Sequence, residues 1–171
     1  MKNSSWKFVI LQLSGLVCSH LLFPWLALPR AVTAQTPSLS SSSSSASVEF
    51  NQLRQTLESH DFTVILDLPP QTGTYGLLHV PSRTVWINPV VFDLGIAIPT
   101  LVHEAVHAAQ LCSGSAGTLS ALNLGLELYA PASRLYMRYS GTRRMLEAEA
   151  YTIQARPDRV PYVTQLLVDR C

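Results

Sequence analysis

Charged residues are scarce in this sequence, and lysine is almost missing. Asp, Glu, Lys and Arg together make up 13% of the 171 residues, and the only two lysines are Lys2 and Lys7. Beyond Ala34 there are nine arginines and eleven acidic residues, so this part carries a formal charge of 9 − 11, or −2, with neutral histidines. Nucleic-acid binding requires basic side chains gathered against phosphates. The lack of a basic patch therefore argues against a nucleic-acid partner.

The first 34 residues have the pattern of a secretory signal peptide. Lys2 and Lys7 give a positively charged start, residues 8–28 are mostly apolar, and Val32-Thr33-Ala34 resembles a cleavage site. This pattern predicts an exported protein, periplasmic or extracellular, from which 1–34 is removed. The apolar run is also about long enough to span a bilayer. An uncleaved leader that anchors the protein is the alternative, and only in that case do we expect contact with a membrane.

Only three cysteines are present, Cys18, Cys112 and Cys171. Removal of the leader would leave an even pair, and an oxidising compartment favours a disulfide between them. Closing a loop of this length contributes roughly 4 kcal/mol in the chain-entropy model. Two free thiols are the other possibility. We do not expect Cys112 to bind a metal, because it lies beyond the reach of a site built on His103 and His107.

Composition predicts a single folded domain after a low-complexity segment. Residues 35–47 are rich in serine, with Ser40 to Ser45 unbroken. Such a segment cannot bury apolar surface, so we expect a disordered linker. The folded domain is then 48–171, which is long enough to build one core.

The apolar spacing predicts an α+β domain. Strand patterns occur in its first half, over 62–68, 75–80 and 83–87. Helical patterns occur around the motif of the next paragraph and over 48–60, 119–129, 142–156 and 160–168. Strands followed by helices indicate a small antiparallel sheet and a mainly helical C-terminal half. The leucines of 119–129 also alternate as in a strand, and there we favour a buried helix that ends before Pro131.

The main functional signal is the pattern His-Glu-x-x-His, from His103 through Glu104 to His107. Residues four apart on a helix project from the same face, so the two imidazoles can bind one Zn²⁺. Glu104 lies about 100° round the helix, where it can take a proton from a water beside the metal. The alternative is a helix whose two histidines are merely hydrogen-bonded core residues. A glutamate between two such histidines has no packing reason, which disfavours that alternative.

The stretch 100–110 resembles the extended signature of the zincin metallopeptidases. In that signature the flanking residues are uncharged, and a Thr or Val often stands three residues before the first histidine, where this chain has Thr100. Glu104 is the only charged residue between Asp93 and Glu127. The resemblance implies a zinc ion with three protein ligands and an open position, the third ligand coming from further along the chain.

The third ligand implied by the resemblance is a carboxylate. The compact zincin pattern with a third histidine does not fit, because Gln110 and Ser113 stand where its glycine and histidine would be. The string from Glu147 to Tyr151 resembles the Glu-x-Glu-Ala-Asp motif on the second helix of the Glu-ligand zincins (gluzincins). The first Glu of that motif binds zinc, so we favour Glu147.

Two other carboxylates are alternatives. Glu127 stands at a thermolysin-like separation from His107, and Glu149 lies two residues after Glu147. The carboxylates of the helix predicted over 142–156 also have a simpler interpretation. They would lie on a solvent-exposed face of that helix and pair with nearby arginines. Tyr151 replaces the Asp of the motif, and there it is a candidate hydrogen-bonding partner of the ligands.

The closest family resemblance is to the minigluzincins and related small gluzincin-like peptidases. It implies zinc-dependent hydrolysis of a peptide bond, with one Zn²⁺ per chain held by His103, His107 and Glu147. Zinc activates a water, and Glu104 acts as the general base. The resemblance also implies an edge strand that pairs with a peptide or protein substrate, and we expect this strand to be 83–87. The candidates for stabilising the oxyanion are Tyr75, His79, Tyr136 and Tyr139.

Two other functions fit the same sequence. One is a secreted zinc-binding domain that interacts with partners but does not catalyse, which the small size favours. The other is a scaffold anchored in the cell envelope by a retained leader. Metal binding without cleavage of any peptide would indicate the first, and the mass of the mature chain tests the second.

Overall fold

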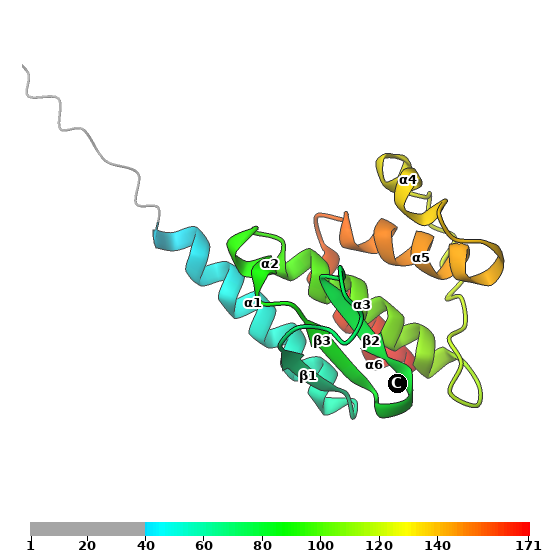
Figure 1. Ribbon diagram of the computed structural model, residues 1–171, viewed down its shortest axis with the longest axis horizontal. Helices are drawn as coiled ribbons and strands as arrows, with labels where there is room; N and C mark the ends of the chain where they lie inside the picture. Colours follow the sequence, from blue (N-terminus) through cyan, green and yellow to red (C-terminus); the bar gives the residue numbers. More distant parts are fainter. Residues whose placement is uncertain (1–39) are drawn as a thin grey trace, which may run out of the picture. The chain divides into compact units, whose positions relative to one another are not determined.

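The computed structural model describes residues 40–171, which form an α+β domain (Figure 1). The expected signal peptide, 1–34, and the first part of the expected linker, 35–39, lie outside the described residues. None of the helices in the described part is long and apolar enough to cross a membrane. In chain order the elements are α1 (Ser40–Ser59), β1 (Thr63–Leu66), β2 (Gly76–His79), a 3₁₀ turn (Val80–Ser82), β3 (Thr84–Ile87), α2 (Val90–Asp93), α3 (Ala97–Ser113), a second 3₁₀ turn (Ala130–Ala132), α4 (Ser133–Tyr136), α5 (Gly141–Gln154) and α6 (Arg159–Arg170).

Helix α1 begins earlier than the sequence predicted. It starts at Ser40, inside the segment expected to be a disordered linker, and not near Val48. Its second half is fixed by Phe50, Leu53 and Leu57, which are buried in the core, whereas residues 45–49 are exposed. Once a packed segment has nucleated a helix, each further residue adds a hydrogen bond at little cost. Serine is only a moderately poor helix former, so the helix extends into the serine run.

The sheet is mixed, and its strand order corrects the expected edge. The order is β1-β3-β2, with β2 antiparallel to β3 and β1 parallel to β3. The expected hairpin of the second and third strands is present, but β3 is the central strand, so the prediction that 83–87 is a free edge is wrong. Thr84, Val85 and Ile87 are buried, whereas no residue of β2 is. The strand with the most buried side chains takes the centre, which leaves β2 as an edge.

Helix α3 is the centre of the domain. It lies between the sheet and the C-terminal helices and contacts α1, α5, α6, β2 and β3 (Figure 1). Every residue from Glu104 to Leu111 is buried. A helix covered on all faces is normally apolar all round. The polar side chains in this stretch, Glu104, His107 and Gln110, therefore need partners inside the protein.

Residues 118–129 contain no helix, so the helix expected over 119–129 is wrong. The backbone of this segment bonds to other elements: Ser120 N–H donates to Gln110 C=O, and Tyr129 N–H donates to Thr152 Oγ1. Asn123 has a φ of 54°, which interrupts any regular element. The segment is not a strand either, although three of its alternating leucines face the core: Leu122 is buried, and Leu124 and Leu126 pack against it.

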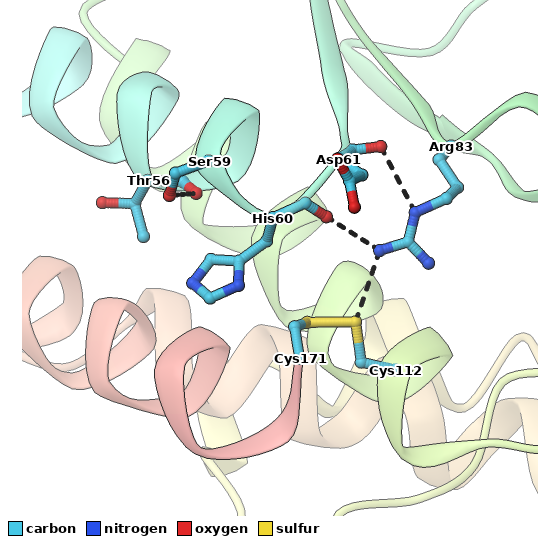
Figure 2. Close-up of a disulfide and its surroundings, with 7 residues drawn as sticks. All are labelled: Thr56, Ser59, His60, Asp61, Arg83, Cys112 and Cys171. Carbon is cyan, nitrogen blue, oxygen red and sulfur yellow. Dashed lines mark hydrogen bonds between the residues drawn. A yellow bond between two sulfur atoms is a disulfide. The ribbon is translucent and has the colours of Figure 1, made fainter.

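A disulfide joins Cys112, near the end of α3, to Cys171, which follows α6, as the sequence predicted (Figure 2). Figure 2 shows Arg83 beside it: its guanidinium donates to the carbonyls of His60 and Asp61 and approaches Cys112 Sγ at 3.6 Å. The disulfide therefore connects the C-terminal ends of two core helices, and Arg83 ties this corner to the end of α1.

Candidate metal centre

Three side chains from two helices converge on one point. Helix α3 supplies His103 and His107, one turn apart, and α5 supplies Glu147. The two Nε2 atoms are 3.2 Å apart, and Glu147 Oε2 lies 3.4 Å from His103 Nε2 and 3.8 Å from His107 Nε2. Among the described residues, these three form the group of His, Cys, Asp and Glu side chains that could hold a metal ion.

The packing of α5 explains why Glu147 reaches α3. Ala150 and Ile153 are fully buried in the same core as α3. Residues three apart share one face of a helix, so Glu147 lies on this buried face as well. The interpretation of Glu147 as part of a solvated face does not hold, since only 7% of the residue is exposed.

Each histidine has a hydrogen-bonding partner at its other ring nitrogen. Nδ1 of His103 lies 2.8 Å from Gln154 Oε1, and Nδ1 of His107 lies 2.7 Å from Gln110 Oε1. Such partners fix the orientation of the ring and leave Nε2 facing the centre. Neither glutamine could be singled out as a histidine partner from the sequence. Gln110 had counted only as a departure from a longer zincin pattern, although its place three residues after His107 puts it on the same helix face.

Tyr151 contacts the centre through its ring. It meets the His103 ring edge to face, with the centroids 4.6 Å apart. Burial and the charge of Glu147 raise the pKa of its phenol. Tyr151 therefore covers one side of the donor group with a protonated phenol. The sequence predicted a hydrogen-bonding partner at this position, and the contact that the structure shows is one between rings.

Glu104 lies on the side of α3 that faces the sheet edge. A Cβ atom on Gly76 would lie 2.6 Å from Glu104 Oε1, so the glycine of β2 makes room for this carboxylate. The backbone of Leu78 hydrogen-bonds the carboxylate. Burial raises the pKa of Glu104 to about 7, against the lowering effects of His103 and of the Leu78 hydrogen bond. This carboxyl group can therefore both accept and release a proton near neutral pH.

The pKa values of the two histidines are shifted in opposite directions. Burial, followed by the charge of His103, lowers the pKa of His107 to about 4. Burial also lowers the pKa of His103, but its hydrogen bond to Glu147 and the charges of Glu104 and Glu147 outweigh burial, so the net shift is upward. Burial raises the pKa of Glu147, but the hydrogen bond and charge of His103 and the charge of His107 lower it overall. In the metal-free protein, the directions of these pKa shifts favour a proton on His103 over one on His107, and favour the ionised form of Glu147.

The donor group opens into a cleft of about 780 Å³. One wall is β2 with the preceding loop, the floor is α3, and the other wall is formed by α5 and the segment before it. Apart from the donor group and Glu104, the charged residues of its lining are Arg138 and Arg143. Arg143 Nε lies 3.7 Å from Glu147 Oε1, the oxygen that is turned away from the histidines.

The other ligand candidates lie elsewhere. Glu127 is exposed in the irregular segment 118–129. Glu149 accepts hydrogen bonds from Gln110 Nε2 and from the backbone of that segment.

Two of the four candidates for oxyanion stabilisation, Tyr75 and Tyr139, line the cleft. His79 bonds Ser82 on the surface, and Tyr136 is buried beside a separate apolar cavity.

Comparison with known proteins found no match among protein-family models, curated proteins or solved structures.

Proposed function

We propose that this protein is a zinc-dependent peptidase of the gluzincin type. The observation that carries the proposal is the arrangement of His103, His107 and Glu147 around one point, with the carboxylate of Glu104 beside them on the side of an unpaired strand edge. Two histidines and one glutamate are the ligand set of a large class of catalytic zinc sites.

The separations of the donor atoms fit zinc. A tetrahedral ion with ligand distances of about 2.0–2.1 Å places its ligand atoms about 3.3 Å from one another. The three separations here are 3.2, 3.4 and 3.8 Å. His103, His107 and Glu147 would therefore hold the ion where they line the cleft.

The chemistry divides between the ion and Glu104. Zinc, when bound, supplies a Lewis acid that lowers the pKa of a water molecule and polarises a carbonyl group. Glu104 would act as the general base, taking a proton from the attacking water and delivering it to the leaving amine. A cation bound beside it would favour the ionised form of Glu104 and lower its pKa from the metal-free value. The Leu78 hydrogen bond and the space left by Gly76 hold the carboxylate in place.

The open edge of β2 is suited to an extended peptide. Asn88 N–H donates to Tyr75 C=O, so the backbone groups of Gly76 and Leu78 point away from β3. No strand in the described part of the chain pairs with this edge. A peptide bound there would pair with Gly76 N–H and C=O and with Leu78 C=O, by strand addition. Both residues line the cleft, so such a peptide would pass beside Glu104.

The disulfide supports placing this activity outside the cytoplasm. Disulfides persist in oxidising compartments such as the periplasm and the extracellular space. The Cys112–Cys171 bond therefore agrees with the export expected from the leader.

The test is the substitution Glu104→Gln, which removes the base but keeps the shape of the side chain. We expect zinc content to be unchanged and hydrolysis of a peptide library to fall by about 10²- to 10⁴-fold. Glu127→Gln is the matched control, because this glutamate is exposed and distant from the donor group. Full activity of Glu104→Gln would refute the mechanism. Zinc binding without cleavage of any peptide by the unmutated protein would leave a non-catalytic zinc-binding domain.

A further inference from the structure

Among the residues that the structure describes, Gln110 is the one polar side chain of the core with no exposed surface. Its amide makes three hydrogen bonds. Nε2 lies 3.0 Å from the carbonyl oxygen of Leu146 and 2.9 Å from Glu149 Oε2, and Oε1 lies 2.7 Å from His107 Nδ1. The side chain therefore bridges the two helices that carry the metal ligands.

These contacts fix which way the amide points. A carbonyl oxygen and an ionised carboxylate can only accept hydrogen bonds, so the NH₂ group of Gln110 must face Leu146 and Glu149. The amide oxygen must then face His107. Because that oxygen also only accepts, the proton of the His107 imidazole lies on Nδ1. Nε2 is left with its lone pair directed at His103 and Glu147, as a metal ligand requires.

Glu149 is itself held in place. Besides Gln110, it accepts hydrogen bonds from the backbone N–H groups of Leu122 at 2.9 Å and Asn123 at 2.8 Å. Three donors orient the carboxylate, so it presents an acceptor to Gln110 at a fixed position. A continuous chain of hydrogen bonds thus runs from segment 118–129 through Glu149 and Gln110 to His107.

We propose that Gln110 and Glu149 are positioning residues of the metal centre. Glu149 holds Gln110 in one orientation, and Gln110 in turn holds the Nδ1–H tautomer of His107. Neither residue touches the metal. The inference rests on the proposed ligands and does not depend on hydrolysis. It also gives Glu149, a candidate ligand from the sequence, a different role.

The substitution Gln110→Met removes the amide but keeps most of the side-chain volume, so His107 Nδ1–H loses its acceptor and the Nε2–H tautomer is favoured. The substitution Glu149→Ala removes one of the two acceptors that hold the NH₂ group of Gln110, while the Leu146 carbonyl keeps the other hydrogen bond. Glu127→Gln is the control, as an exposed glutamate near the same segment.

The first readout is the tautomer of His107 in the metal-free full chain. Long-range ¹H–¹⁵N correlation spectra, recorded above the ordinary histidine pKa, distinguish the two tautomers. We expect Nδ1–H in the unmutated protein, a clear shift toward Nε2–H in Gln110→Met, and a smaller shift in Glu149→Ala. A His107 that is mainly Nε2–H in the unmutated protein would overturn the inference, whether or not the variants fold.

The second readout is zinc affinity, measured by competition with a chromophoric chelator. Loss of a partner of a ligating histidine costs about 10- to 100-fold in metal affinity. We expect such a loss in Gln110→Met, a smaller loss in Glu149→Ala, and none in Glu127→Gln. Unchanged affinity and an unchanged tautomer in Gln110→Met would refute the positioning role of Gln110, and the same result in Glu149→Ala would refute that of Glu149. Absence of zinc binding by the unmutated protein would instead refute the proposed function, and the tautomer would still test this inference.

Discussion

Glu104 is the residue whose chemistry depends most on its surroundings. It is 6% exposed, lies against a glycine of the neighbouring strand and has a pKa raised to about 7 in the metal-free protein, mainly by burial. The folded protein therefore holds a proton on Glu104 between its ordinary pKa of 4.5 and about 7, whereas the unfolded chain releases it. Stability consequently falls as the pH rises through this window and stays lower above it.

This dependence predicts a pH-dependent effect of Glu104→Gln on the metal-free protein. We expect the variant to be about as stable as the unmutated protein at about pH 4, and more stable by up to about 3 kcal/mol at about pH 8. The charge of Glu104 also contributes to the raised pKa of His103, so the difference between the two curves reports on Glu104 together with its interaction with His103. The measurement is the free energy of unfolding in urea across this range. A difference that stays constant with pH, or one that grows toward acid, would be inconsistent with a buried, protonated Glu104.

The sequence was most informative about residues whose spacing is set by one helix. His103 and His107 face the same way because they are four residues apart, and no tertiary knowledge is needed for that. Glu147 required the resemblance, since its distance from the histidines depends on how α5 packs on α3. Gln110 and Gln154 could not be singled out, because a glutamine becomes a partner of a histidine only when its helix is fixed in place.

At the scale of elements, helix α3 and strand β2 build the site together. The strand order explains how: β3 takes the centre of the sheet because its side chains are buried, and β2 is left as the edge beside α3. The sequence predicted the strands and the hairpin but not which strand lies at the edge. Hydrophobic alternation along a segment can identify a strand. Which strands pair with it depends on contacts between residues far apart in the sequence, and alternation carries no information about those.

Segment 118–129 shows a second limit of local patterns. Its leucines fit the spacing of a helix and of a strand, but it forms neither, and the backbone N–H groups of Leu122 and Asn123 donate to Glu149 instead. These donors and acceptor are separated by more than twenty residues, so helical periodicity could not reveal them. The N–H groups of Leu122 and Asn123, which would otherwise start or continue a helix, are used to orient a side chain near the metal centre.

The disulfide is the main covalent constraint between elements. It closes a loop of 59 residues between the ends of α3 and α6. Reduction, or the paired change Cys112→Ser, Cys171→Ser, is therefore expected to lower the free energy of unfolding by roughly 4 kcal/mol, through the larger entropy of the unfolded chain. Denaturant titrations with and without a reductant measure this effect. The paired serine variant serves as the control, since a reductant has nothing to cleave in it. Equal stability of the oxidised and reduced protein would contradict a stabilising cross-link.

At the scale of the whole molecule, the order of strands and helices predicted the α+β class correctly. The domain places a small sheet on one side of α3 and the C-terminal helices on the other (Figure 1). The donor group lies where α3 and α5 meet, so a bound metal would connect two elements of the core. A ligand that binds only the folded state stabilises it according to its concentration and affinity.

Zinc should therefore raise the thermal stability of the entire domain. At a free zinc concentration about 100 times the dissociation constant, we expect a gain of about 2.7 kcal/mol in the free energy of unfolding. Addition of a chelator should reverse it. Thermal unfolding with zinc, with chelator and with magnesium as a control cation measures the gain. An unfolding temperature that is independent of zinc would mean that the donor group does not bind it in the folded state.

The most direct test of the central claim is the zinc content of the purified protein by mass spectrometry under non-denaturing conditions. His103, His107 and Glu147 as the ligands predict about one zinc per chain, strongly reduced in Glu147→Ala and unchanged in Glu127→Ala. No zinc in the unmutated protein after loading, or full zinc in Glu147→Ala, would contradict the metal centre and the peptidase function built on it.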